Sequence, residues 1–181
     1  MAFLSHMFDN PRIQIKRYAY ILLKAGRFYD NIVKHMKNYM ELALKEAKKA
    51  EAEEEVPVGA VIVKGNEIIA KAHNKTRQTH DPTAHAEILA IREASEKIGS
   101  TRLSGCTMYV TLEPCSMCVG ALVLARLSEV VIGARDFKSG ACGSALNVVT
   151  AKALNHKVKV SWDDTDKECG EILKRFFQAR R

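Results

Sequence analysis

Apolar residues recur along the chain with two spacings, and these predict alternating helices and strands. Beyond residue 35, the first apolar positions lie three or four residues apart, with lysine and glutamate between them: Met36, Met40, Ala43, Leu44 and Ala47. This spacing predicts an amphipathic helix. The helix runs into the acidic stretch 51–55 before Pro57, and we interpret that stretch as a solvated helix end without a functional role.

Two β-branched runs follow and predict the first part of a sheet. Residues 60–63 and 67–72 are separated by residues 64–66, Lys-Gly-Asn, which predict a hairpin turn. A hairpin makes this first strand pair antiparallel. The polar residues 75–80 predict a loop after the second strand.

The next segment predicts a helix that begins beside the first group of reactive side chains. Asp81 and Pro82 are typical of a helix start, with an aspartate cap followed by proline at the first helical position. Gly99 is typical of the end of such a helix. His85 and Glu87 are therefore expected in its first turn. The face expected to be buried consists of Ile88, Ile91, Ala94 and Ile98.

The second half of the chain continues with strand and helix patterns. The further predicted elements are strands at 107–111, 130–132 and 157–160 and helices at about 115–127 and 167–180. The closing helix is expected to bury Cys169, Ile172, Leu173, Phe176 and Phe177. A strand, a helix and a strand in succession predict a right-handed crossover and parallel strands. With the antiparallel hairpin, this order predicts an α/β fold with a central mixed sheet of about five strands.

Composition narrows the class of protein. The chain has 181 residues, which is enough for one domain with a substantial core. No apolar run reaches the length of a membrane span, and no N-terminal stretch has the order of a secretory signal. Five cysteines, two of them in a Cys-x-x-Cys, favour reduced thiols over a disulfide framework. We therefore expect a cytoplasmic protein without a membrane partner.

Residues 1–35 differ from the rest of the chain. They hold six of the 28 lysines and arginines but only two of the 21 acidic residues, and the bases are mixed with aromatic residues such as Tyr18, Tyr20, Phe28 and Tyr29. Bases interleaved with rings are found in nucleic-acid-binding arms. Because terminal segments are commonly untethered, we favour an N-terminal extension outside the catalytic fold. Residues 36–181 are then the functional domain. The net charge of +7 alone is weak evidence for a nucleic-acid partner.

Two short groups of residues carry the candidate chemistry: His85 with Glu87, and Cys115 with Cys118. One imidazole and two thiolates would bind a zinc ion and leave its fourth tetrahedral position open, as in catalytic sites. The two cysteines lie three residues apart at the start of a predicted helix, so both thiols face the same side of that helix. The helix dipole favours negative charge at this end, which makes the thiolate forms easier to produce. Residues two apart on a helix do not face each other. The pocket that takes His85 and Glu87 is therefore expected beyond the helix end.

The combination H-x-E…P-C-x-x-C is the signature of zinc nucleobase deaminases. Four longer stretches resemble the bacterial tRNA-specific adenosine deaminases: residues 56–60, 80–87, 111–118 and 133–136. The resemblance covers roughly residues 36–181. It implies a three-layer α/β/α, cytidine-deaminase-like fold and a homodimer with one zinc ion per subunit. It also implies a tRNA partner, bound through its anticodon stem-loop.

The activity implied by this resemblance is hydrolytic deamination of the wobble adenosine to inosine in an arginine tRNA. In this scheme a zinc-activated water is the attacker, and Glu87 is the catalytic proton shuttle. The resemblance further implies that Asn74 contacts the flipped base. The segment implied to approach the anticodon is Asp136, Phe137 and Lys138. The closing helix adds Phe176, Phe177, Arg180 and Arg181 as implied RNA contacts, with core packing as the alternative for both phenylalanines.

The remaining histidines and Trp162 have simpler interpretations, and the same motifs also suit other functions. His73 and His80 are interpreted as loop or surface residues, because three metal ligands are already present. Trp162 is expected in the core. The same zinc chemistry would also suit a free base or nucleotide, such as guanine, cytosine or a dCMP-like substrate. A non-catalytic RNA-binding module with a structural zinc has no need of a free carboxylate at Glu87, and a thiol redox protein would cycle a disulfide instead.

Overall fold

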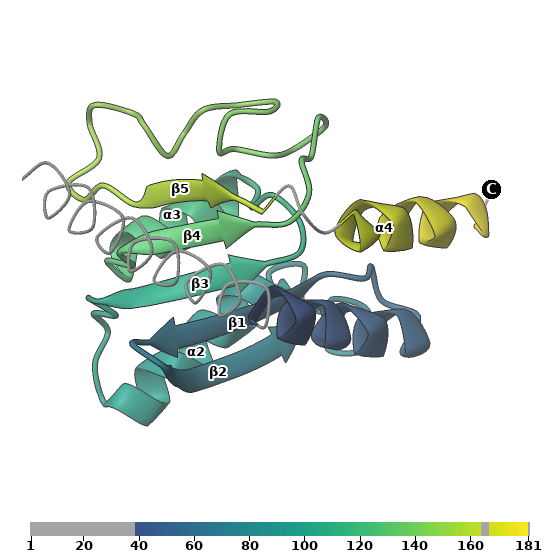
Figure 1. Cartoon of the computed structure of the whole chain (residues 1–181), viewed down its shortest axis with the longest axis horizontal. Helices are drawn as coiled ribbons and strands as arrows, with labels where there is room; N and C mark the ends of the chain where they lie inside the picture. Colours follow the sequence, from purple (N-terminus) through teal and green to yellow (C-terminus); the bar gives the residue numbers. More distant parts are fainter. Residues whose placement is uncertain (1–38, 164–166, 181) are drawn as a thin grey trace, which may run out of the picture. The chain divides into compact units, whose positions relative to one another are not determined.

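The computed structural model describes residues 39–163 and 167–180, which are built around one five-stranded sheet (Figure 1). The strands are β1 (Gly59–Lys64), β2 (Glu67–His73), β3 (Cys106–Val110), β4 (Glu129–Ile132) and β5 (Lys159–Trp162). Their order across the sheet is β2-β1-β3-β4-β5. β1 is antiparallel to β2 and β3, whereas β3, β4 and β5 run parallel. The mixed sheet expected from the sequence is confirmed, although β5 begins at Lys159 instead of Lys157.

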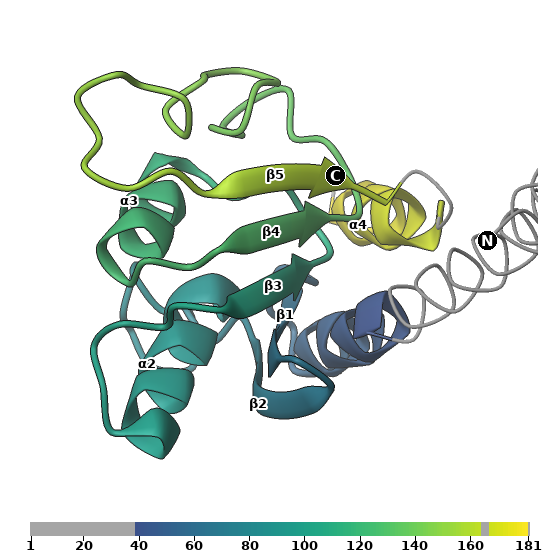
Figure 2. The same cartoon turned by 60° about the vertical axis from the view of Figure 1, so that its left-hand side comes forward.

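Helices cover both faces of the sheet (Figure 2). α2 (Ala86–Ile98) and α3 (Ser116–Leu124) lie on one face, and the helical residues 39–52 and α4 (Glu168–Gln178) lie on the other. This arrangement confirms the three-layer α/β/α fold and explains why the apolar residues of β1 are fully buried. None of the helices in the described part of the chain has both the length and the apolar character that a membrane span needs.

The first helix and the hairpin follow their apolar patterns. Met40, Ala43 and Ala47 are buried along helix 39–52. Gly65 lies between β1 and β2 with φ 60°, a conformation that glycine adopts without strain. Met36 and the predicted domain boundary between residues 35 and 36 lie outside the described residues, as do all expectations for residues 1–35.

The start of α2 corrects one prediction. The helix begins at Ala86, with His85 as its N-cap, and not at Asp81 and Pro82. The Asp81 carboxylate instead accepts hydrogen bonds from the backbone N–H and the hydroxyl of Thr83, at 2.7 and 2.6 Å. Such local bonds compete with helix formation. Gly99 ends the helix with φ 69°, as expected.

The buried face of α2 also differs from the prediction. It is formed by Ala86, Glu87, Ala90 and Ala94, whereas the three isoleucines of the helix are only half-buried. Small alanines let the helix approach the sheet closely, so the larger side chains are displaced toward the edge of the contact.

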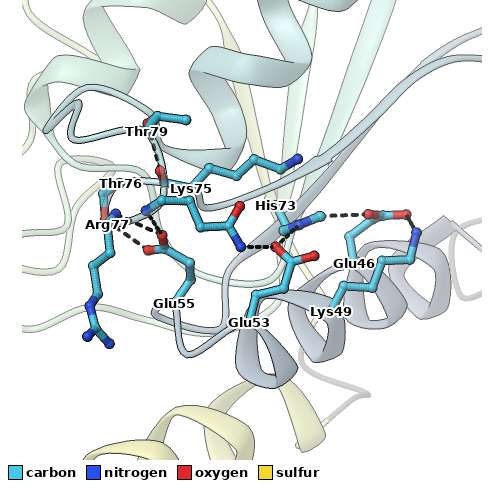
Figure 3. A network of polar contacts seen from close by, with 10 residues as sticks. Glu46, Lys49, Glu53, Glu55, His73, Lys75, Thr76, Arg77 and Thr79 are labelled. Carbon is cyan, nitrogen blue, oxygen red and sulfur yellow. Dashed lines mark hydrogen bonds and ion pairs between the residues drawn. The ribbon is translucent and has the colours of Figure 1, made fainter.

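The acidic stretch 51–55 is not merely solvated, contrary to the prediction (Figure 3). Glu55 is 0% exposed. One of its oxygens accepts the backbone N–H groups of Arg77 and Gln78, at 2.7 and 2.9 Å. The other accepts the hydroxyl of Thr76 at 3.0 Å. A buried carboxylate is costly unless hydrogen bonds satisfy it, and Glu55 therefore fixes the loop that precedes α2.

His73 is likewise not the loop or surface residue that was expected. It ends β2, is 7% exposed and lies between two carboxylates (Figure 3). Its Nδ1 is 3.1 Å from Glu46 Oε2, and its Nε2 is 3.0 Å from Glu53 Oε2. The hydrogen bond with His73 lowers the pKa of the Glu53 carboxyl. These contacts tie the first helix to the end of β2. His80 is exposed, as predicted.

The closing helix α4 agrees with its pattern except at one position. Cys169, Ile172, Leu173 and Phe176 are buried, but Phe177 is 51% exposed. Neighbouring helical residues point about 100° apart, so Phe176 and Phe177 cannot both face the core. The prediction that Phe177 is buried was therefore wrong. Trp162 is half-buried, and the Arg135 guanidinium lies 4.0 Å from the centre of its ring.

Candidate metal and catalytic site

The N-terminal ends of α2 and α3, which contact each other, carry the predicted metal ligands. His85 is the N-cap of α2, Cys115 is the N-cap of α3, and Cys118 lies in the first turn of α3. Both N-cap residues have extended backbones, and neither side chain makes a capping hydrogen bond. Their side chains are thus available for a site beyond the helix ends. This placement explains how His85 and Glu87, two residues apart, serve one pocket.

The three ligand atoms have the spacing of a tetrahedral metal site. His85 Nδ1 lies 3.8 Å from Cys115 Sγ and 3.5 Å from Cys118 Sγ, and the two sulfurs are 3.7 Å apart. At ordinary bond lengths, a tetrahedral zinc ion separates two sulfur ligands by about 3.8 Å and a sulfur from a nitrogen by about 3.6 Å. Among the described residues, this is the single such group of histidine, cysteine and acidic side chains.

Protons are distributed unevenly among the three ligands. The hydrogen bond with Cys118 and the contact with His85 lower the pKa of Cys115 to about 4. The same thiol–thiol contact, together with burial, raises the pKa of Cys118. The contact with Cys115 raises the pKa of His85. Metal ligands must be deprotonated, so a divalent cation that binds here would displace protons from Cys118 and His85.

Glu87 is the buried acid of the site. It is 3% exposed, and its Oε2 atom has no hydrogen-bond partner within the described part of the chain. Burial raises the pKa of its carboxyl, while His85 and Cys118 act in the opposite direction. A buried carboxylate oxygen without a partner is costly. An acid with a raised pKa beside a metal site is the type of group that transfers protons.

Asn74 lies between the loop and α2. It is 6% exposed, and its Oδ1 accepts the backbone N–H of Ala86 at 2.8 Å. Asn74 thus supplies the side-chain cap that His85 does not. The side-chain amide N–H groups of an asparagine remain separate donors, so the cap leaves this side chain able to donate to a ligand.

Asp136, Phe137 and Lys138 lie in the segment that follows β4. The Asp136 carboxylate accepts the backbone N–H groups of Lys138 and Ser139, at 2.8 and 3.2 Å. Its carboxylate thus shapes its own turn. Phe137 is 76% exposed. Neither Asp136 nor Lys138 belongs to the group of His85, Cys115 and Cys118.

Glu113 is a residue beside the metal site that no sequence pattern predicted. Glu113 is 2% exposed, and its carboxylate accepts three backbone N–H groups, those of Asp136, Cys142 and Ser144. These bonds connect the turn before Cys115 to the segment after β4. The available signal was the position of Glu113, a charged residue that lies between a buried strand and Pro114. A charge that is buried there needs hydrogen-bond partners.

Known proteins are similar to this chain in sequence and in fold. Residues 34–181 match the family model described as MafB19-like deaminase. The tRNA-specific adenosine deaminase of Bacillus subtilis (strain 168) is 49% identical over 143 residues, which are 79% of this chain and 89% of that protein. This chain belongs to the tRNA-specific adenosine deaminase family. The family recognised from the two metal-binding segments is thereby confirmed.

Solved structures agree with this family. A structure from a study of A-to-I editing by tRNA:A34 deaminases has a TM-score of 0.73 and 44% sequence identity, and the match covers 76% of this chain and 99% of that one. A guanine deaminase from Bacillus subtilis has a TM-score of 0.55 and 32% identity, over 80% of this chain and 92% of that one. The tRNA-specific family therefore has relatives of similar fold that act on a free base.

Proposed function

We propose that this chain is a zinc-dependent hydrolase that converts the wobble adenosine of a tRNA anticodon to inosine. The observation that carries the proposal is the group of His85, Cys115 and Cys118 with the unpartnered Glu87 oxygen in the same buried site. A structural zinc site has four protein ligands and needs no free acid. A member of this deaminase family with three ligands and such an acid has the components for hydrolytic deamination.

Zinc is the metal that suits this donor set. One imidazole and two thiolates at tetrahedral spacing are typical of zinc, and one ion per chain is expected. When bound, zinc lowers the pKa of a coordinated water so that hydroxide forms near neutral pH.

Glu87 moves the protons of the reaction. Its carboxylate takes a proton from the attacking water and delivers it to the ring nitrogen next to C6 of adenine. The water oxygen forms a bond to C6, and the C6–nitrogen bond then breaks. Glu87 then takes the remaining proton from the oxygen now bonded to C6 and passes it to the amino nitrogen, which leaves as ammonia. One water is consumed, and inosine and ammonia are the products.

The anticodon loop is the substrate that this chemistry favours. A deaminase can act only on a base that is outside the helical stack, and an anticodon loop presents unpaired bases. We assign Asn74 to the flipped base, and Asp136 and Lys138 to the surrounding loop. Phe177 is 51% exposed and available for an RNA contact, whereas Phe176 is buried in the core. An arginine tRNA is the proposed carrier of the wobble adenosine.

We further propose a cytoplasmic homodimer whose catalytic domain is residues 36–181. The match of residues 34–181 to the family model supports this domain limit. The homodimer is what the family resemblance implies, and Leu124 on α3, which is 78% exposed, is an apolar side chain at the surface. Deleting residues 1–35 should leave catalytic activity intact. Loss of activity with the fold preserved would show instead that the extension takes part in catalysis.

The substrate assignment is tested with a panel of candidates. The zinc-loaded protein is incubated separately with an arginine tRNA anticodon stem-loop, adenosine, guanine, cytosine and dCMP, and ammonia and inosine are measured. Inosine from the stem-loop alone is the expected result. Ammonia released from guanine or cytosine, with the stem-loop unchanged, would assign the same zinc chemistry to a free base. No ammonia from any substrate by zinc-loaded protein would favour a non-catalytic module.

A further inference from the structure

The segment after β4 is attached to the turn that carries Cys115. The backbone N–H of Ala141 donates to the carbonyl of Pro114 at 2.9 Å, and Gly140 pairs with Cys115 in an isolated antiparallel bridge. The segment 136–144 therefore lies directly against a metal ligand. It forms neither a helix nor a long strand, so its conformation depends on individual contacts.

Glu113 provides the central contacts of this segment. Its Oε2 accepts the N–H of Asp136 at 3.1 Å, and its Oε1 accepts the N–H groups of Cys142 and Ser144 at 2.9 and 3.0 Å. One buried carboxylate thus holds both ends of the segment. Hydrogen bonds to a charged acceptor are roughly twice as strong as bonds between neutral groups. The Glu113 carboxylate therefore stabilises the segment more than an ordinary loop contact would.

Gly140 leaves room for the Glu113 carboxylate. A Cβ at residue 140 would lie 2.5 Å from Glu113 Cδ and 2.6 Å from its Oε2. It would also lie 2.5 Å from the backbone oxygen of Asp136. The absence of a side chain at residue 140 is therefore a second, independent condition for the same arrangement.

The fixed segment presents side chains that the protein itself does not bury. Phe137 is 76% exposed and is followed by Lys138, which is also exposed. Exposed aromatic and basic groups are the usual contacts of single-stranded RNA. Holding the backbone still reduces the ordering that substrate binding would otherwise require.

We propose that Glu113 is a positioning residue that fixes segment 136–144 against the metal-binding turn, so that Phe137 and Lys138 meet the anticodon loop in one defined geometry. This inference rests on the proposed tRNA substrate. Glu113 touches neither the metal ligand atoms nor, in this assignment, the reacting base. Its effect is therefore expected on substrate binding more than on the chemical step.

The test compares zinc-loaded wild type with Glu113→Gln, Gly140→Ala and the double variant. The glutamine keeps the shape of the side chain but replaces one acceptor oxygen with a donor. We expect KM for the anticodon stem-loop to rise about tenfold in each single variant, with kcat within about threefold. The double variant should resemble the single ones, because both substitutions break the same contact. Glu96→Gln is the matched control. It makes the same substitution on the exposed side of α2, at a glutamate that does not bond segment 136–144.

Two further readouts separate positioning from general damage. Hydrogen exchange of the backbone amides in segment 136–144 should accelerate in both single variants, and zinc content should stay at one ion per chain. Loss of zinc, unchanged exchange, or faster exchange with unchanged KM would each overturn the proposal.

If Glu113→Gln fails to fold, Gly140→Ala decides alone. If wild type makes no inosine, the proposed function fails, and the positioning role toward RNA is overturned with it. The exchange data then still show whether Glu113 holds the segment.

Discussion

Two buried glutamates lie close to the metal ligands in sequence, and their surroundings are opposite. Glu87 follows His85 by two residues, is 3% exposed and has an oxygen without a partner in the described residues. Glu113 precedes Cys115 by two residues, is 2% exposed and accepts three backbone N–H groups. Burial alone therefore does not distinguish a reacting acid from a structural one.

Hydrogen bonding makes that distinction. A carboxylate that accepts several N–H groups is held in one position, which suits the fixing of a loop. A carboxylate buried without such donors has a raised pKa and exchanges protons more readily, which suits acid–base catalysis. In the proposed mechanism, the region around α2 provides the reacting group, and the region between β3 and α3 provides the rigid frame.

The largest effect is expected from removal of a metal ligand. Cys118→Ser should lose zinc and reduce stem-loop deamination to the uncatalysed background, because neither Glu87 nor the bound RNA can lead to deamination without the ion. Cys106→Ala is the matched control, since Cys106 is buried in β3 and is not part of the ligand group. Metal analysis and ammonia release on both variants check this. A Cys118→Ser protein that keeps zinc and activity would contradict the ligand assignment.

The next largest effect is expected at Glu87. Glu87→Gln should retain zinc and fold but lose about 10³-fold or more in kcat, because Glu87 is the group assigned to the proton transfers. Single-turnover deamination of the stem-loop measures this loss. Glu113→Gln should keep most of its kcat in the same assay. Similar kcat values for the two variants would remove the distinction between the two glutamates.

Stability should change in opposite directions in the two variants. Because burial raises the pKa of Glu87, the folded metal-free protein binds this proton more tightly than the unfolded chain does. That contribution to stability is complete below the ordinary glutamate pKa and is lost as the pH rises through the raised value. Glu87→Gln removes this dependence of the free energy of unfolding on pH. At about pH 8 it should be more stable than wild type by about 1–3 kcal/mol, and at about pH 4 the difference should disappear.

Glu113→Gln should instead be less stable than wild type at about pH 8, by about 1–3 kcal/mol, because a buried N–H loses its acceptor. Urea unfolding of metal-free wild type and both variants at the two pH values measures these differences. If both substitutions shift the free energy of unfolding in the same direction at the higher pH, the contrast between the two carboxylates is wrong.

The smallest effect on catalysis is expected at Glu55. This glutamate also accepts three hydrogen bonds, but from the loop before α2. Glu55→Gln should lower the free energy of unfolding by about 1–3 kcal/mol, with kcat/KM changed less than about threefold, since its donors are residues 76–78 and it bonds neither a metal ligand nor segment 136–144. A KM increase as large as that of Glu113→Gln would mean that both loops contact the RNA.

The sequence predicted the sheet, its mixed topology and the metal ligands, because these depend on local patterns. Apolar spacing marks β1 and β3, and the spacing of Cys115 and Cys118 marks one side of a helix start. The roles of Glu55, Glu113 and His73 depend on partners that are at least 20 residues away. No local pattern contains such information. The start of α2 was misplaced because Asp81 and Pro82 fit a cap locally, while the Asn74 side chain caps the helix from a distance.

The central claim is that the metal site and Glu87 together convert a wobble adenosine to inosine. The most direct measurement is sequencing of an arginine tRNA transcript after incubation with protein of known zinc content, alongside the same protein stripped of metal and then reloaded. We expect the wobble adenosine to be read as guanosine with zinc-loaded and reloaded protein, and to remain adenosine with stripped protein. Conversion by metal-free protein, or an unchanged wobble base with fully loaded protein, would contradict it.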